Sequence, residues 1–203
     1  MGGMMTGTGV DLFGLWARNG QVLAVGAAGT LVQSAGSSWV SQSLPAAGGK
    51  TLRAIWGTVG NALWLVGDGG TLLAWDGTSA LAVNTGISDT LRAIWGSAAD
   101  DVWAVGDGGR VLHYDGSAWS VHAQGSALTK QSLLAVGGRS RKAVYAVGDG
   151  GVLLFYDGTM WRQQDGGTQR RLSGIASLPD GDVWFVGQGA SILRSRNVSS
   201  GSP

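Results

Sequence analysis

The chain contains no cysteine and no glutamate, and it has only three lysines, three prolines and two histidines. The absence of cysteine excludes disulfide bonds and thiolate metal sites. The absence of glutamate and the scarcity of lysine remove two strong helix-forming residues. The 13 acidic residues, all aspartates, nearly balance the 14 lysines and arginines, and the net charge is +1. Because no long charged block occurs, we expect no binding to nucleic acid.

The sequence also lacks a long apolar run, so no segment is expected to insert into a membrane. The first residues, MGGMMTGTGV, have neither the basic start nor the apolar centre of a signal peptide. Single small clusters such as Arg170 with Arg171 are typical of solvated surface.

What the chain has in abundance is glycine and tryptophan, 37 and 10 residues respectively, and they recur periodically. TLRAIWG occurs at 51–57 and again at 90–96, with weaker copies in the other repeats. A second motif ends in Val-Gly and is usually followed by Asp-Gly-Gly. It reads VLAVGAAG (22–29), LWLVGDGG (63–70), VWAVGDGG (102–109), VYAVGDGG (144–151) and VWFVGQGA (183–190). The spacing of about 40 residues is typical of propeller blades.

Each repeat reads as four short strands separated by Asp-Gly and Gly-Gly turns, which suit tight hairpins. Sustained helical spacing of apolar residues is missing. Radially repeated four-stranded antiparallel units form a propeller. The sequence therefore predicts an all-β fold, a five-bladed β-propeller in a single domain, residues 1–203.

The predicted blades cover residues 11–50, 51–89, 90–130, 131–170 and 171–203, with an N-terminal strand within 1–10. The fifth repeat ends near Asn197, before a recognisable fourth strand. We expect residues Met4 to Thr8 to supply that strand, so that the N- and C-terminal segments close the ring. A closed monomer is the expected state, although pairing between chains would give an oligomer.

The stretch VWAVGDGGRVLHYDGSAWS (102–120) resembles the blades of bacterial neuraminidase-repeat (Asp-box) and photosystem II assembly factor-like propellers. The resemblance extends over residues 12–197 and implies the propeller fold. In an Asp box the glycine comes two residues after the aspartate, whereas here it follows Asp115 and Asp157 directly. Because many such repeats occur in secreted or surface proteins of bacteria, the resemblance implies an extracellular or cell-surface setting.

Aspartates and arginines in equivalent repeat positions are the first candidate binding residues. In a four-stranded meander, the turn between the second and third strands lies on the same ring face as the links between blades. That places Asp68, Asp107 and Asp149 beside those links, where a sugar or peptide could bind between blades. Arg53 and Arg92 occupy equal positions in blades two and three. The alternative is that these aspartates only stabilise their turns.

Tryptophans at the end of the inner strand are the second candidate set: Trp16, Trp56 and Trp95. They could line one mouth of the central channel, where an aromatic face stacks on a sugar ring. The alternative for these three residues is packing in the core.

The inner strands carry neither carboxylate nor histidine, so we predict that the protein is not an enzyme and has no catalytic residues. His113 and His122 are expected in adjacent strands of blade three; they lack the spacing of a metal site and are expected to be structural or exposed. The glycines after the second strand open another strand rather than a helix, which excludes a nucleotide-binding loop. We therefore expect neither metal nor cofactor.

Two functions remain open. The first is a lectin-like propeller that binds carbohydrate at repeated sites between blades, because repetition gives avidity. The alternative is a scaffold that binds a protein surface on one ring face. The close similarity of blades two and three also fits a designed or consensus-like propeller without a natural ligand.

Overall fold

A computed structural model describes residues 8–58, 60 and 62–195 as five separate antiparallel sheets. The first contains β1 (Leu12–Arg18), β2 (Gln21–Gly26), β3 (Thr30–Ala35) and β4 (Ser38–Ser43). The second contains β5 (Leu52–Trp56), β6 (Leu63–Gly67), β7 (Leu72–Trp75) and β8 (Ala80–Ala82). The third contains β9 (Leu91–Ala98), β10 (Asp101–Gly106), β11 (Val111–Tyr114) and β12 (Trp119–Val121).

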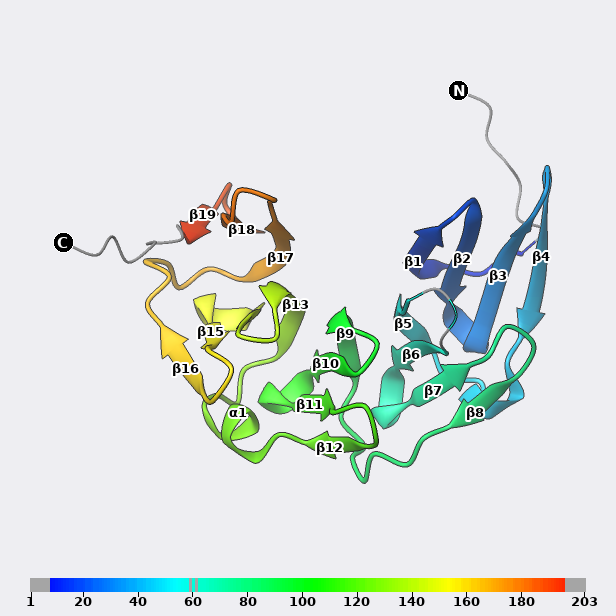
Figure 1. Cartoon of the computed structure of the whole chain (residues 1–203), viewed down its shortest axis with the longest axis horizontal. Coiled ribbons are helices and arrows are strands. Elements are labelled where there is room, and N and C mark those ends of the chain that lie inside the picture. Colours follow the sequence, from blue (N-terminus) through cyan, green and yellow to red (C-terminus); the bar gives the residue numbers. More distant parts are fainter. Residues whose placement is uncertain (1–7, 59, 61, 196–203) are drawn as a thin grey trace.

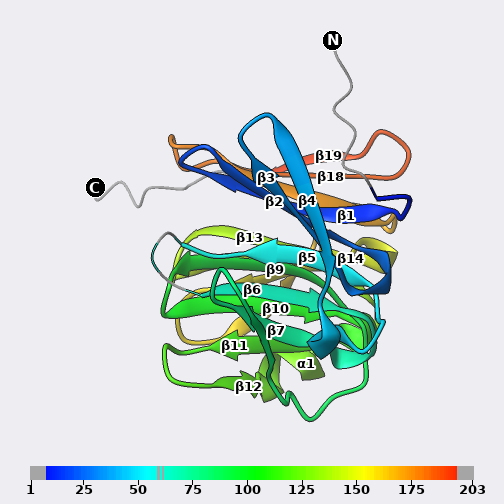
Figure 2. The same cartoon turned by 90° about the vertical axis from the view of Figure 1, so that its right-hand side faces the viewer.

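The fourth sheet contains β13 (Leu133–Ser140), β14 (Ala143–Gly148), β15 (Leu153–Tyr156) and β16 (Trp161–Gln164), and the fifth β17 (Leu172–Ser177), β18 (Val183–Gly187) and β19 (Ile192–Ser195). In every sheet neighbouring strands follow one another in sequence. Figure 2 shows this order in the third sheet, where the strands lie one below another from β9 to β12. The prediction of a repeated four-stranded unit is confirmed for the first four sheets.

The glycine of the motif that ends in Val-Gly is required because two backbone segments approach closely there. A Cβ atom on Gly67 or Gly106 would collide with the carbonyl oxygen of the residue just before the inner strand, Thr51 or Thr90. The next amide donates to that same oxygen, as in Asp68 N to Thr51 O at 2.9 Å. Glycine is therefore the residue that lets the second strand end against the start of the first.

The hydrophobic core lies between the sheets rather than in one central mass. Four clusters of buried side chains fill the four interfaces between consecutive sheets. The cluster between the third and fourth sheets, for example, joins Trp103 and Val105 to Val144 and Leu154. Each sheet thus depends on its neighbours for burial of its apolar faces.

The structure shows an open arc of sheets and not the predicted closed ring. In Figure 1 the five sheets lie along an arc that is open between the β1–β4 sheet and the β17–β19 sheet. Within the described residues the fifth sheet has three strands, and Thr8 belongs to no strand. The proposed closing strand at residues 4–8 otherwise lies outside the described residues.

Within the described residues one short α-helix, α1 (Ala123–Ala127), follows β12, and five three-residue 3-10 turns link strands or sheets: Ala27–Gly29, Pro45–Ala47, Asp68–Gly70, Asp107–Gly109 and Asp149–Gly151. The N-cap of α1 is His122, whose Nδ1 accepts the amide of Gly125 at 3.1 Å. Over the part of the chain that the structure describes, no helix is long and apolar enough to cross a membrane.

Candidate functional site: the ion-pair face

Two arginine–aspartate pairs occupy equivalent positions in the second and third sheets. Arg53 pairs with Asp68 through Nε–Oδ1 and through Nη2–Oδ2, the latter at 3.2 Å. Arg92 pairs with Asp107 in the same two-pronged way, with Nη2–Oδ2 at 3.0 Å. The structure therefore brings four predicted site residues together as two bidentate pairs, an arrangement that fixes both side chains.

The pairing arises from a β-bulge at the start of each inner strand. Leu52 pairs with Gly67 and Ala54 with Val66, so Arg53 has no partner on β6. Arg92 likewise has no partner on β10, because Leu91 pairs with Gly106 and Ala93 pairs with Val105. Because a bulge turns a side chain away from the regular alternation, each arginine meets the aspartate that follows the second strand.

Electrostatics hold the Arg92–Asp107 pair in its charged form. The hydrogen bond from Arg92 keeps the pKa of Asp107 below its ordinary value, and burial opposes this only in part. The same hydrogen bond raises the pKa of Arg92. A hydrogen bond with Ser132, from the start of the fourth sheet, also lowers the pKa of Asp107.

The pattern changes toward the ends of the arc. In the fourth sheet Leu134 replaces the arginine, and Asp149 instead faces Arg171 of the next repeat, with Nε–Oδ1 at 3.4 Å. In the first sheet Phe13 stands in the arginine position and its ring centroid lies 5.8 Å from Arg53 Cζ. We call this set the ion-pair face: Phe13, Arg53, Asp68, Arg92, Asp107, Asp149 and Arg171.

The predicted tryptophans pack between blades. Trp56 lies against Gly96 of the next sheet, and Trp95 lies against Gly138 of the one after. The indole Nε1 of Trp16 donates to the carbonyl oxygen of Gly57 at 2.9 Å. Each of the three tryptophans therefore contacts the glycine that lies five residues after the first residue of the next inner strand. Their predicted role in ligand stacking stays a prediction.

Trp16 additionally lines a cavity of about 470 Å³ between the first two sheets. Its other walls include Arg18, Gln21, Trp75 and Asp76. Sequence reasoning did not single out Arg18 or Gln21, because they lie in a hairpin without a repeated motif.

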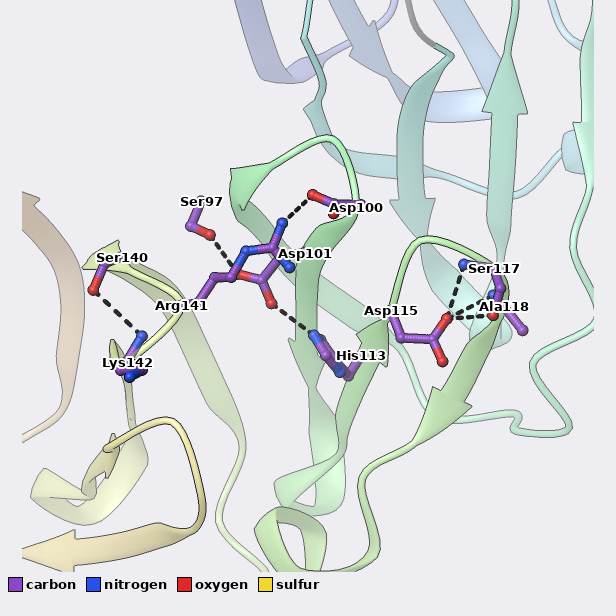
Figure 3. Close-up of polar contacts among 10 residues, drawn as sticks. All are labelled: Ser97, Asp100, Asp101, His113, Asp115, Ser117, Ala118, Ser140, Arg141 and Lys142. Atoms are coloured by element: carbon purple, nitrogen blue, oxygen red, sulfur yellow. Dashed lines mark hydrogen bonds and ion pairs between the residues drawn. The ribbon is translucent and has the colours of Figure 1, made fainter.

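Aspartates on the opposite ring face stabilise the turns between the third and fourth strands. Asp115 Oδ1 accepts the amides of Ser117 and Ala118 at 2.8 and 2.9 Å, as Figure 3 shows. Asp157 Oδ1 accepts from the hydroxyl of Thr159 and from the amides of Met160 and Thr159, and these hydrogen bonds lower the pKa of Asp157 to about 2. These side chains are engaged in holding their own turns, as the sequence predicted.

A polar pair in the third sheet, formed by a buried aspartate and a partly buried histidine, was missed by sequence reasoning. Asp101 Oδ1 lies 2.8 Å from His113 Nε2, and Asp101 also accepts from Ser97 (Figure 3). Burial raises the pKa of Asp101, but the hydrogen bonds from His113 and Ser97 outweigh it and the pKa is lowered. An ionised carboxylate can only accept, so His113 donates its Nε2 proton. The His113 ring also stacks on Trp103 at 3.9 Å.

The signal for this pair is visible in the alignment of the repeats. Two positions 12 residues apart change together from blade to blade. They are Gln21 and Gln33, Ala62 and Ala74, Asp101 and His113, Ala143 and Phe155, and Asp182 and Arg194. In the fifth sheet the carboxylate of Asp182 pairs with Arg194 in the same place.

His122 does not lie in a strand, contrary to the expectation that both histidines fall in adjacent strands. It caps α1, and burial followed by the proximity of His113 lowers its pKa. Among the described residues no group of three metal-ligating side chains comes together.

No protein-family model matches the sequence, and no curated protein matches it. Solved structures do match. Selenomethionine-substituted virginiamycin B lyase from Staphylococcus aureus superposes with a TM-score of 0.78 at 10% identity, covering 95% of this chain and 72% of that one. YCF48 bound to D1 peptide matches with a TM-score of 0.71 at 16% identity, covering 95% of this chain and 67% of that one.

YCF48 from Cyanidioschyzon merolae matches with a TM-score of 0.62 at 12% identity, covering 93% of this chain and 73% of that one. Identities this low carry the fold but neither the lyase activity nor the peptide recognition. The chain is therefore an all-β protein of propeller architecture, similar in fold to virginiamycin B lyase and to YCF48.

Proposed function

We propose that this protein is a non-enzymatic propeller that binds a polypeptide segment on the ion-pair face. The observation that carries the proposal is the repetition of a bulge-seated arginine and its aspartate in consecutive blades, at Arg53–Asp68 and Arg92–Asp107. The alternative function, protein binding on one ring face, thus has more support than carbohydrate binding between blades.

The chemistry of the face suits an extended peptide. The side chains of both pairs are about one third exposed, at 31–33%, so their outer N–H groups and oxygens can still meet a ligand. Bidentate pairing holds them in place before binding, which reduces the entropy lost on association. Phe13, 52% exposed beside Arg53, adds an apolar contact at the edge of the same face.

The comparison with solved structures also supports a polypeptide as the ligand. A structure of YCF48, which shares the fold of this chain, contains a bound D1 peptide. That peptide is a ligand of YCF48; for the present chain it supports the class of ligand, a polypeptide, and not its sequence. The proposed setting remains extracellular or cell-surface.

Selection from a displayed library of random linear peptides tests the proposal. Peptides selected on the wild-type protein should bind the variant Arg92→Gln/Asp107→Asn at least about tenfold more weakly, a loss of roughly 1.4 kcal/mol. Binding should weaken with added salt, because the face is charged. The matched control is Arg162→Gln/Asp157→Asn, which removes an ion pair at an opposite-face turn. Selected peptides that lose affinity only for the control variant would overturn the proposal.

Saccharide binding is a second candidate, favoured by the cavity beside Trp16. Its walls combine two indole rings, Trp16 and Trp75, with the polar side chains of Arg18 and Gln21, and this combination is common where proteins hold sugars. A glycan array distinguishes the two. Binding that disappears in Gln21→Ala but persists in Arg92→Gln/Asp107→Asn would place a sugar site in this cavity and not on the ion-pair face.

A further inference from the structure

The two ends of the arc expose side chains that every interior blade buries. Leu15 of β1 is 68% exposed, whereas its counterparts Ile55, Ile94 and Val136 are at most 8% exposed. At the other end, Ile192 of β19 is 64% exposed. The counterparts of Ile192 are all buried: Leu31, Leu72, Val111 and Leu153.

We call these two surfaces the end faces: the side of the first sheet around Leu15, turned away from the second sheet, and the side of the fifth sheet around Val186 and Ile192. Val186 is 46% exposed although Val25, Val66, Val105 and Val147 in its position are fully buried. The residue types at the ends are unchanged; only the neighbouring sheet is missing. Exposed apolar patches of this kind mark interaction surfaces.

The width of the opening follows from the fold comparison. Five blades cover 72% of virginiamycin B lyase, 67% of YCF48 bound to D1 peptide and 73% of YCF48 from Cyanidioschyzon merolae. One blade therefore corresponds to about one seventh of those chains, and the unmatched part is about the size of two blades. The open side of the arc in Figure 1 lies between the two end faces. We take it to correspond to the unmatched part of those chains.

We propose that the end faces are docking surfaces for a wedge of two further four-stranded blades built from this same repeat. One side of the wedge packs on Val186 and Ile192 as an interior blade packs on Val147 and Leu153, and its other side packs on Leu15. The part of the neighbouring structures that this chain does not match is larger than one blade and smaller than the five blades of a second copy.

A chain with two added repeats tests this directly. Ser195 holds the same repeat position as Tyr114, so adding residues 115–195 and then 115–122 directly after Ser195 completes the fifth sheet and adds two four-stranded blades in register. Closure should remove most of the fluorescence of a dye that binds exposed apolar surface and raise the melting temperature. The matched control adds residues 157–195 and then 157–164, which gives a single four-stranded blade; it should keep the dye signal.

The variant Leu15→Asp separates docking from a general gain in stability. In the present chain it should leave the melting temperature unchanged, because Leu15 faces solvent. In the extended chain it should lower the melting temperature by several degrees and restore dye binding. An extended chain that melts and binds dye as the present one does would overturn the proposal.

A second measurement keeps the proposal testable if the extended chain fails to fold. The chain has no cysteine, so spin labels attached through Leu15→Cys and Ile192→Cys report one distance across the opening. We expect separated labels and a monomer in sedimentation. Labels in contact within one chain would mean that the five blades close directly, and a dimer would mean that a second copy covers the faces; either result contradicts the proposal.

Discussion

Trp56 on β5 lies over Gly96 on β9, where a side chain larger than hydrogen would collide with the indole. The same relationship joins Trp95 to Gly138 one blade later. A large aromatic residue on one inner strand and a glycine on the next therefore set how closely two blades approach. Between β5 and β9 this packing contact takes the place of a backbone ladder, because each sheet forms its ladders internally.

Replacing Gly96 by alanine should separate the second and third blades. The new Cβ would meet both the Trp56 ring and the carbonyl oxygen of Asp101, the latter at 2.8 Å. Overpacking of this kind costs about 1–3 kcal/mol, which should appear as a lower melting temperature in thermal unfolding. Gly9→Ala is the control, since no atom lies within 4 Å of its Cβ position. Partial rescue by Trp56→Phe is expected; equal stability of Gly96→Ala and wild type would refute the contact.

The Asp101–His113 pair should behave as one unit. Asp101→Ala leaves His113 and Ser97 without their buried acceptor and should cost about 1–3 kcal/mol of unfolding free energy. The double variant Asp101→Ala/His113→Ala has the same two residues at these positions as the second blade, Ala62 and Ala74. Its loss of unfolding free energy should be clearly smaller than the sum of the losses in the two single variants. Chemical denaturation of the four proteins measures the coupling. Simple additivity would mean that the two residues do not interact.

Acid should weaken the turn that Asp157 holds. The pKa of Asp157 is about 2 in the folded protein, below the value of about 3.9 for an aspartate in an unfolded chain. A depressed folded pKa contributes stability above the unfolded pKa, and that contribution disappears as the pH falls toward 2. The difference in unfolding free energy between wild type and Asp157→Asn should therefore be largest above pH 5 and shrink toward pH 2. The exposed residue Asp11, mutated to Asn, is the control; a pH-independent difference for Asp157→Asn would contradict this assignment.

The ion pairs of the proposed binding face should matter little for stability. Their side chains are about one third exposed, and solvent screening leaves such pairs a contribution of roughly 0–1 kcal/mol. Arg92→Gln/Asp107→Asn should thus melt within a few degrees of wild type while losing peptide affinity. A large drop in melting temperature would assign the pair a structural role.

The strands and hairpins could be predicted from the sequence because they depend on local signals. The run LRAIWG, the motif that ends in Val-Gly and the Asp-Gly turns are each repeated, and each specifies a strand or a turn by itself. Closure of the ring could not be predicted in this way. It depends on the small angle between neighbouring blades, which contacts such as Trp56 with Gly96 determine and which no single motif encodes.

The candidate site was predicted in part for a similar reason. Asp107 was assigned correctly to a turn beside the links, and Arg92 was recognised as equivalent to Arg53. Their pairing depends on the bulge that skips Arg92 in the β9–β10 register, and a bulge is invisible in an alternating apolar pattern. For the tryptophans the sequence left two roles open, lining of the channel mouth and packing in the core, because their glycine partners lie in another repeat.

The paired positions 12 residues apart also limit how such a gene can be rearranged. A crossover between repeats that fell inside a blade, after position 101 and before position 113, would combine Asp101 with the Ala74 or Phe155 of another copy. The buried carboxylate would then have lost its partner, at a cost of several kcal/mol. A crossover in the links between sheets keeps every pair together, so whole blades are the pieces that recombination can duplicate or exchange without unfolding the protein.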